Sequence, residues 1–395
     1  DEGNSLIWGS LFRDETITNL KVIIIIMKKN FLLILFLLVT AWTLAQQNFS
    51  KPEVKAIMKR VADWQIANPN KGAEHDDLDW THAALYMGMV DWAELTEKED
   101  NDNSYYKWLL KIGQRNHFQV GKWMYHADFI AVGQPFIDLY IKYGNKKMVA
   151  PVMARANWVV ENPAETTLEL DYSKLETLDR WSWCDALFMA PPVYAKLYAL
   201  TKNKKYLDFL NKEYKATYEY LYDKEEQLFY RDRRYFGKKE ANGKKVFWGR
   251  GNGWVLGGLS EILQVLPENE PSREFYKNLF VSLATRVAGL QSPDGYWHAS
   301  LLDPVSYPSP ETSATGFIVY ALAYGVNEGL LDKATFLPVI QKGWNALVDA
   351  VEPDGKLGYV QPIGADPRKV TRDMTEVYGV GAFLLAGCQI YKMVN

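Results

Sequence analysis

Cysteine and histidine are scarce in this chain, which has 395 residues but only 2 cysteines and 5 histidines. Cys184 lies in an apolar segment and Cys388 in an apolar terminal stretch. We therefore predict two buried free thiols rather than a disulfide, and a fold that depends on a large hydrophobic core. The sequence also lacks HExxH, paired CxxC, P-loop and GxSxG motifs, which leaves metallopeptidase, zinc-finger, NTPase and α/β-hydrolase functions without support.

An excess of positive charge is missing as well, because 45 Lys and Arg residues stand against 48 Asp and Glu residues. The resulting net charge of −3 implies no polyanion-binding surface, so no nucleic-acid partner is expected. Aromatic residues are abundant by contrast, with 14 Trp and 24 Tyr. Aromatics beyond the needs of a core suggest stacking on sugar rings.

One continuous apolar run stands out, at residues 31–45, and it is too short for a comfortable membrane span. It follows the short basic start Met27-Lys28-Lys29-Asn30 and ends at Ala45, which predicts a secretory signal peptide over residues 27–45. Residues 1–26 are expected to be an upstream extension, and residues 46–395 a single catalytic domain. We expect secretion across the inner membrane, to the periplasm or the exterior, without stable membrane insertion after signal cleavage.

Apolar residues recur at a period of 3.6 from Lys51 onward, and strand-like alternation is scarce. Two Pro-Asp-Gly turns, at Pro293 and Pro353, each follow a predicted helix and lie 60 residues apart. That period divides the mature chain into about six helical hairpins. They form either a closed inner and outer ring or an open solenoid, and the apolar segment 376–393 favours closure. The expected helices are 52–68, 80–98, 103–116, 133–144, 146–160, 183–200, 203–222, 252–266, 272–291, 312–327, 332–349 and 373–393.

The almost wholly apolar segment 180–201 contains a single acidic residue, Asp185. If this segment is helical, then Trp181, Asp185, Phe188 and Pro192 share one face. Burial among aromatic side chains raises the pKa of a carboxyl group, so that it can donate a proton near neutral pH. The alternative is a structural aspartate that caps a helix or pairs with an arginine such as Arg180.

A second acidic residue, Asp128, follows the aromatic stretch Trp123-Met124-Tyr125-His126. It is either the N-cap of a helix or a second carboxylate that faces Asp185. Two neighbouring carboxylates push their pKa values apart, so one holds a proton while the other stays ionised. The sequence leaves both interpretations open.

The most unusual stretch, residues 247–254, places Arg250 between Trp248 and Trp254 among three glycines. A guanidinium grips a carboxylate through two parallel hydrogen bonds, and indoles stack on sugars, so this stretch suggests an acidic sugar. The alternative is a tight helix-entry loop with Arg250 in a structural ion pair.

Three further loops complete the candidates. His298 ends the stretch 294–298 and is expected to reach the pocket mouth. Glu311 is expected to begin and cap a helix. The acidic stretch 75–79 lacks the calcium-loop pattern and is expected to be a solvated loop that ends at Trp80.

Together these motifs resemble the unsaturated rhamnogalacturonyl/glucuronyl hydrolases, glycoside hydrolase family 105, which is close to family 88. The resemblance spans nearly all of the chain after residue 45 and implies an all-α (α/α)6 barrel. The stretches that carry it are Trp183-Cys184-Asp185-Ala186-Leu187-Phe188-Met189-Ala190-Pro191-Pro192, Tyr125-His126-Ala127-Asp128, Trp248-Gly249-Arg250-Gly251-Asn252-Gly253-Trp254 and Asp294-Gly295-Tyr296-Trp297.

The resemblance implies an exo-acting hydrolase for oligosaccharides that polysaccharide lyases leave with a 4-deoxy uronate at the non-reducing end. Such enzymes hydrate the C4=C5 double bond, and the product rearranges so that the glycosidic bond breaks. Carried over by position, Asp185 protonates C4 and activates the water that adds at C5, while Asp128 tunes and orients Asp185. The implied partner is an acidic oligosaccharide, and neither a metal nor an organic cofactor is implied.

One departure from the family lies at residues 228–232, where Arg231 occupies a position that is histidine in many relatives. Arg231 is expected to contact a carboxylate or a sulfate of the substrate. Products of rhamnogalacturonan rank first as substrates and ulvan-derived products second. The alternatives are a glycosidase or epimerase for saturated sugars and a non-catalytic oligosaccharide-binding protein. The residues expected to bind substrate are Trp80, His126, Trp183, Arg231, Trp248, Arg250, Trp254 and His298.

Overall fold

The computed structural model describes residues 49–69 and 75–394. The predicted signal peptide, residues 27–45, lies outside the described residues, and the chain from Ser50 onward forms one compact unit. No helix in the described part is long and apolar enough to cross a membrane. The helices and strands are α2 (Lys51–Ala67), α3 (Trp80–Asp100), α4 (Ser104–Arg115), η1 (Ala127–Phe129), α5 (Gly133–Tyr143), η2 (Lys146–Met148), α6 (Ala150–Glu161), η3 (Leu175–Leu178), α7 (Ala186–Met189), α8 (Pro191–Thr201), α9 (Lys204–Leu221), β1 (Tyr222–Asp223), β2 (Leu228–Phe229), η4 (Arg233–Tyr235), α10 (Gly249–Val265), α11 (Arg273–Ala288), α12 (Thr312–Asn327), α13 (Lys333–Asp349) and α14 (Val377–Met393).

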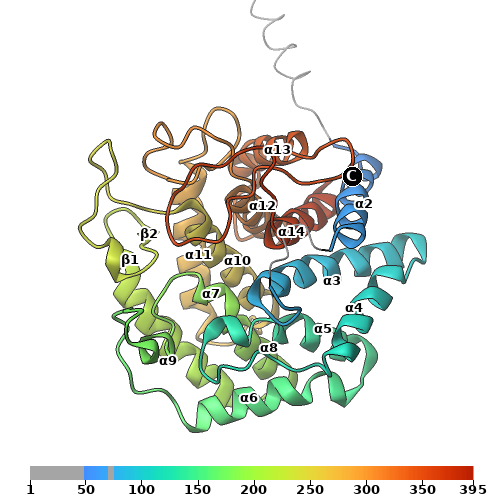
Figure 1. Ribbon diagram of the computed structural model, residues 1–395, viewed down its shortest axis with the longest axis vertical. Coiled ribbons are helices and arrows are strands. Elements are labelled where there is room, and N and C mark those ends of the chain that lie inside the picture. Colours follow the sequence, from blue (N-terminus) through green and yellow to red (C-terminus); the bar gives the residue numbers. More distant parts are fainter. Residues whose placement is uncertain (1–48, 70–74, 395) are drawn as a thin grey trace, which may run out of the picture. The chain divides into compact units, whose positions relative to one another are not determined.

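Six of these helices form a closed inner ring. Helices α3, α5, α8, α10, α12 and α14 each contact the next, and α14 contacts both α12 and α3. In Figure 1 the colours follow the chain around this ring until α14 lies between α12 and α3. The ring is therefore closed, as the apolar terminal segment predicted, and the open solenoid is wrong.

The remaining long helices form the outer layer. Helices α4, α6, α9, α11 and α13 pack against the inner helices that precede them, and α2 packs against α14. Buried side chains recur every three or four residues along outer helix α9, whereas every residue from Val377 to Ile390 of inner helix α14 is buried. One-sided burial is typical of a surface helix and all-round burial of a core helix. The structure thus confirms the predicted all-α barrel of six hairpins.

Glycine allows the ring to close where its two ends meet. A Cβ atom at Gly381 of α14 would lie 2.1 Å from the carbonyl oxygen of Ala84, and one at Gly88 of α3 would lie 2.4 Å from that of Gly381. These separations are far below van der Waals contact, so only glycine permits the backbones of α3 and α14 to touch.

The predicted helix 183–200 is the largest local error. The structure divides it into α7 and α8 at Ala190, because Pro191 has no backbone N–H and clashes with a preceding turn. Trp181 precedes both helices, so the single face proposed for Trp181, Asp185, Phe188 and Pro192 is wrong. Both cysteines are free and buried, as predicted.

Candidate active site

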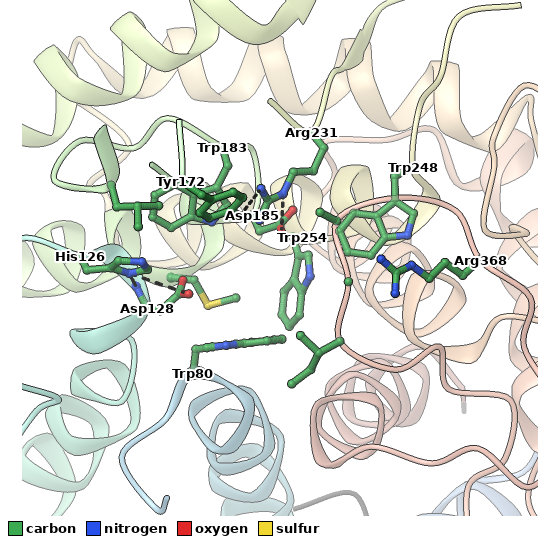
Figure 2. Close-up of a pocket in the computed structure, with 15 residues that line it drawn as sticks. Trp80, His126, Asp128, Tyr172, Trp183, Asp185, Arg231, Trp248, Trp254 and Arg368 are labelled. Carbon is green, nitrogen blue, oxygen red and sulfur yellow. Dashed lines mark hydrogen bonds and ion pairs between the residues drawn. The ribbon is translucent and has the colours of Figure 1, made fainter. Parts of the chain in front are cut away.

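A cavity of about 370 Å³ opens at the N-terminal ends of the inner helices. Since each inner helix follows an outer one, the loops before the inner helices gather at this mouth of the barrel, which we call the site mouth. Figure 2 shows His126 and Asp128 on one side of the cavity and Trp248 and Arg368 on the other. The residues that line it are Trp80, His126, Asp128, Tyr172, Leu178, Trp183, Asp185, Met189, Arg231, Trp248, Trp254, Ile363, Gly364, Ala365 and Arg368.

Asp185 occupies the N-cap position of α7 and is 8% exposed. Its Oδ1 accepts a hydrogen bond from the Cys184 thiol at 3.3 Å, and its Oδ2 accepts one from Arg231 Nε at 3.4 Å. Burial raises the pKa of Asp185, although Arg231 opposes this shift. The proposed pairing with Arg180 is wrong, because Arg180 donates to Glu213 instead.

Asp128 lies within η1, and its side chain is 22% exposed. The N-cap is His126, whose Nδ1 accepts from the Asp128 backbone N–H at 3.2 Å, so the capping alternative for Asp128 is wrong. Burial, together with the negative charge of Asp185, raises the pKa of Asp128 to about 8. Burial also lowers the pKa of His126 to about 4, so this imidazole is neutral at pH 7. The two carboxyl groups therefore retain a proton near neutral pH.

Arg231 supplies the buried positive charge of the cavity, with its side chain 10% exposed. It donates to Asp185 Oδ2, to Asp232 Oδ2 at 2.8 Å and to the Tyr172 hydroxyl at 3.2 Å. Arg234 also donates to Asp232 through Nε at 2.8 Å, so two guanidinium groups share that fully buried carboxylate. Arg231 is thus fixed in the wall with its charge facing the cavity.

Four indoles line the cavity, and all four were predicted: Trp80, Trp183, Trp248 and Trp254. Trp80 meets the edge of Trp254 at a centroid distance of 5.9 Å, and Trp183 lies 4.9 Å from the His126 ring. These side chains present flat apolar faces to a narrow space. That arrangement suits a pyranose ring.

Arg250 is not among the lining residues, which corrects its predicted role. It is 1% exposed and its guanidinium carbon lies 4.5 Å from the ring centroid of Trp248. It donates to the carbonyl oxygen of Gln361, to that of Pro362 at 3.0 Å and to the Tyr378 hydroxyl at 3.2 Å. These partners are neutral, so the expected ion pair is wrong too. Helix α10 begins at Gly249, three residues earlier than predicted, and the arginine turns into the protein.

His298 also fails to reach the cavity. It is 5% exposed, with Nδ1 2.8 Å from the carbonyl oxygen of Ser309 and Nε2 3.1 Å from Asp294 Oδ2. It thus joins two parts of the connection between α11 and α12, away from the lining residues. The predicted cap at Glu311 is confirmed, since its carboxylate accepts from two backbone N–H groups in the first turn of α12.

Seven lining residues were not predicted as site residues, and three of these seven are exposed. Tyr172 is 49% exposed, Ile363 39%, and the Arg368 side chain 61%. The cavity therefore opens to solvent between the loop before α7 and the loop before α14. The sequence did contain a general signal for the three exposed residues. Each lies in a loop that precedes a predicted inner helix, and all such loops end at the same mouth of the barrel.

The arrangement combines a carboxyl pair that holds a proton, a buried arginine and four indoles. Among the described residues, no group of three or more His, Cys, Asp or Glu side chains could hold a metal ion. The indoles, the arginine and the carboxyl pair can stack a sugar, attract its carboxylate and move a proton to or from it.

Comparison with known proteins gives a consistent result. A profile described as "Glycosyl Hydrolase Family 88" matches residues 45–394. A protein of Formosa agariphila named "Unsaturated 3S-rhamnoglycuronyl hydrolase" is 40% identical over 360 residues, which cover 88% of this chain and 93% of that protein.

Two solved structures are similar over most of their length. "Glycosyl hydrolase family 88 from Bacteroides vulgatus" is 32% identical with a TM-score of 0.76, and the match covers 87% of this chain and 99% of that one. A structure named "Polysaccharide Lyase BACCELL_00875" is 37% identical with the same TM-score, and the match covers 87% and 98%. These matches agree with the family expected from the motifs.

Proposed function

This chain belongs to glycosyl hydrolase family 88 and is a glycosidase, and we propose that it removes a 4-deoxy-Δ4,5-unsaturated uronate from the non-reducing end of oligosaccharides. The observation that carries this proposal is the buried carboxyl pair of Asp128 and Asp185 beside Arg231, inside a cavity lined by indoles, where burial raises the pKa of both acids. The buried lining residues lie deep and the exposed ones at the mouth, so the cavity suits the end of a sugar chain.

The chemistry follows from where the proton and the positive charge lie. Asp185 donates its proton to C4 while the oxygen of a water molecule adds at C5, and the proton of that water returns to the carboxylate. The C5 hemiketal opens to a ketone, which leaves a hemiacetal at C1. Collapse of that hemiacetal to an aldehyde releases the sugar alcohol that was linked there. Asp128 shares the proton that the pair retains, so Asp185 can carry this proton when the sugar is bound.

Arg231 suits the uronate carboxylate, because a guanidinium in the wall of a partly desolvated cavity offers a charge-assisted hydrogen bond. Trp80, Trp183, Trp248 and Trp254 suit the faces of the unsaturated ring. No metal ion or organic cofactor takes part in this proposal.

For the sugar that leaves, we propose rhamnose with a sulfate group. The Formosa agariphila relative is named for a "3S-rhamnoglycuronyl" substrate, which we interpret as a 3-sulfated rhamnose. Arg368 supports the assignment, because it places a second positive charge on the cavity lining at the exposed end. This preference moves ulvan-derived products ahead of rhamnogalacturonan products, the reverse of the order expected from the motifs.

We also propose export to the periplasm or the exterior, which the segment 27–45 supports.

The test is the near-ultraviolet absorbance of the unsaturated uronate. Incubation of the full chain with unsaturated disaccharides of sulfated rhamnose, unsulfated rhamnose and galactosamine should remove this absorbance fastest with sulfated rhamnose. Steady absorbance with every lyase digest would contradict the proposal. Release of saturated monosaccharides from oligosaccharides that carry no double bond would instead support the glycosidase or epimerase alternative.

A second candidate is a polysaccharide lyase, which the name of one similar solved structure favours. A lyase creates the C4=C5 double bond, so absorbance would rise on an intact uronate polysaccharide. The same assay therefore separates the two functions by the sign of the change. Binding of the oligosaccharide without any change would identify a non-catalytic sugar-binding protein.

A further inference from the structure

The outer wall of the cavity is a stretch without helix or strand, residues 361–369, between α13 and α14. It supplies Ile363, Gly364, Ala365 and Arg368 to the lining. Such a stretch has no helical hydrogen bonds of its own to fix its position. Its backbone must be held by contacts with the barrel if the cavity is to keep one shape.

Gln361 provides those contacts. It is 0% exposed, and its side chain and backbone together take part in five hydrogen bonds. The side-chain Nε2 donates to the carbonyl oxygen of Asp366 at 2.9 Å, which closes the wall on itself. The side-chain Oε1 accepts from Trp248 Nε1 at 3.2 Å, which ties the wall to an indole of the cavity.

The backbone of Gln361 joins two more inner helices. Its N–H donates to Glu311 Oε1 at 3.1 Å, and Glu311 is the N-cap of α12. Its carbonyl oxygen accepts from the Tyr378 hydroxyl at 2.5 Å and from Arg250, which come from α14 and α10. One buried residue thus binds the ends of α10, α12 and α14 to the wall.

We propose that Gln361 is a positioning residue that sets the subsite for the leaving sugar, and that Arg250 acts through it. This inference rests on the proposed function, because the leaving sugar must pass between the exposed residues at the cavity mouth. Among the hydrogen bonds of the described residues, none joins Gln361 to Asp128 or Asp185. Its effect therefore falls on the binding of substrate and not on proton transfer.

Gln361→Leu removes both side-chain hydrogen bonds and keeps the three that the backbone makes. We expect KM to rise tenfold or more while kcat stays within threefold, since an interaction made equally in ground and transition states affects KM alone. Gln389→Leu is the matched control. Gln389 is 1% exposed, lies on α14 away from the site mouth, and pairs with Asn327. That variant should lose comparable stability and keep KM within twofold.

Tyr378→Phe is a milder variant in case Gln361→Leu fails to fold. It deletes only the hydroxyl that donates to the Gln361 carbonyl oxygen and keeps the ring that stacks on Trp80 at 5.3 Å. We expect a two- to fivefold rise in KM. A KM unchanged in both Gln361→Leu and Tyr378→Phe, or raised equally in Gln389→Leu, would overturn the proposal.

Amide hydrogen exchange, measured without substrate, tests the positioning role of Gln361 independently of the proposed function. Without substrate, residues 362–369 should exchange faster in Gln361→Leu than in the unsubstituted protein, and at the unsubstituted rate in Gln389→Leu. Equal exchange in the Gln361 variant would refute the positioning role. Failure of the unsubstituted protein to act on any unsaturated uronide would refute the proposed function alone.

Discussion

The two ends of the inner ring both bury carboxyl groups beside a basic side chain, but they arrange them differently. At the C-terminal ends of the inner helices, which we call the far mouth, Lys196 Nζ lies 2.6 Å from Asp138 Oδ2 and 3.6 Å from Glu261 Oε2. Tyr320 donates to the other oxygen of Glu261 at 2.5 Å. Although burial lowers the pKa of Lys196, the two carboxylates raise it above its ordinary value. The positive charge of Lys196 is therefore paired, and its contacts join α5, α8 and α10.

At the site mouth the basic side chain is shared and one acid is left over. Arg231 lies nearer to Asp232 than to Asp185. Within the described part of the chain, the only ionisable basic side chain within 4 Å of the Asp128 carboxylate is His126, which is neutral. A carboxyl pair with one shared cation keeps a proton that a fully paired carboxylate releases. Incomplete pairing is thus what suits the site mouth for proton transfer.

A raised pKa alone does not separate the two ends. Burial and the charge of Glu261 raise the pKa of Asp91, at the far mouth, to about 7. Asp91 lines a cavity of about 500 Å³ whose lining residues, within the described part of the chain, include no tryptophan. A sugar-processing site needs both the indoles and a carboxyl group that can give up a proton in one cavity. Matched substitutions at the two ends test this comparison.

The largest difference is expected for Asp185→Asn and Asp91→Asn. Asp185→Asn keeps the shape of the side chain but cannot give up a proton, so kcat/KM should fall by about 10³-fold. Asp91→Asn should leave kcat/KM within twofold, because Asp91 touches no residue of the active site. Rates of absorbance loss and circular dichroism check both variants. Full activity in folded Asp185→Asn would break the comparison.

The reciprocal experiment is Lys196→Met at the far mouth. Removal of one member of a buried ion pair leaves uncompensated charge, so the free energy of unfolding should fall by about 3–5 kcal/mol. The KM for the unsaturated disaccharide should stay within twofold, since Lys196 lies outside the site cavity. Urea unfolding and steady-state kinetics measure the two effects. A loss of activity without a loss of stability would contradict this prediction, because Lys196 would then serve the reaction and not the stability of the fold.

Arg231→Gln is the matching change at the site mouth. Because Arg234 still pairs with Asp232, the free energy of unfolding should fall less than in Lys196→Met. The KM for the uronate should rise about 10- to 100-fold, since a charge-assisted hydrogen bond contributes about 1.5–3 kcal/mol. Binding calorimetry with an unsaturated disaccharide and Asp185→Asn as background separates this loss from catalysis. An unchanged affinity would remove Arg231 from substrate binding.

The smallest effect is the pH dependence of stability in Asp128→Asn. The pKa of Asp128 is about 8 in the folded protein and 3.8 ordinarily, so the folded chain holds a proton that the unfolded chain releases. Stability from this group is complete below about pH 4 and is lost as pH rises towards 8. Asp128→Asn should therefore gain stability relative to the unsubstituted protein as the pH rises from about 4 to about 8. A constant difference across this range would mean that Asp128 titrates normally.

Periodicity predicted a helical barrel and residue type made Trp248 and Trp254 candidates for sugar stacking, whereas Trp80 was assigned to the site through the family resemblance. The repeat of Pro293 and Pro353 gave the number of hairpins, and the apolar α14 predicted closure. Trp248 and Trp254 are six residues apart. A helix that begins just before or just after Arg250 therefore places both indoles near the same mouth of the barrel. The apolar surroundings of Asp185 made it a candidate but left a structural role open, and only the family resemblance assigned it the catalytic role.

What failed depended on contacts between distant segments. Arg250 turns inward because Gln361 and Pro362 offer carbonyl oxygens, and those residues follow it by more than 100 positions. Arg368 and Tyr172 lie in stretches without helical periodicity, where nothing in the sequence fixes direction. A resemblance transfers residue types by position, but it does not transfer the partners that decide where a long side chain points.

The most direct test of the central claim is the pH dependence of a single turnover. The claim is that the carboxyl pair at the site mouth holds the proton that reaches the sugar. With enzyme in excess, the rate of absorbance loss should fall as pH rises through about 8, in the unsubstituted protein and in Asp91→Asn alike. A rate that stays constant or rises from about pH 6 to about pH 10 would contradict the account. Above about pH 8 the pair has lost its proton, so the proton that reaches the sugar would have to come from another group.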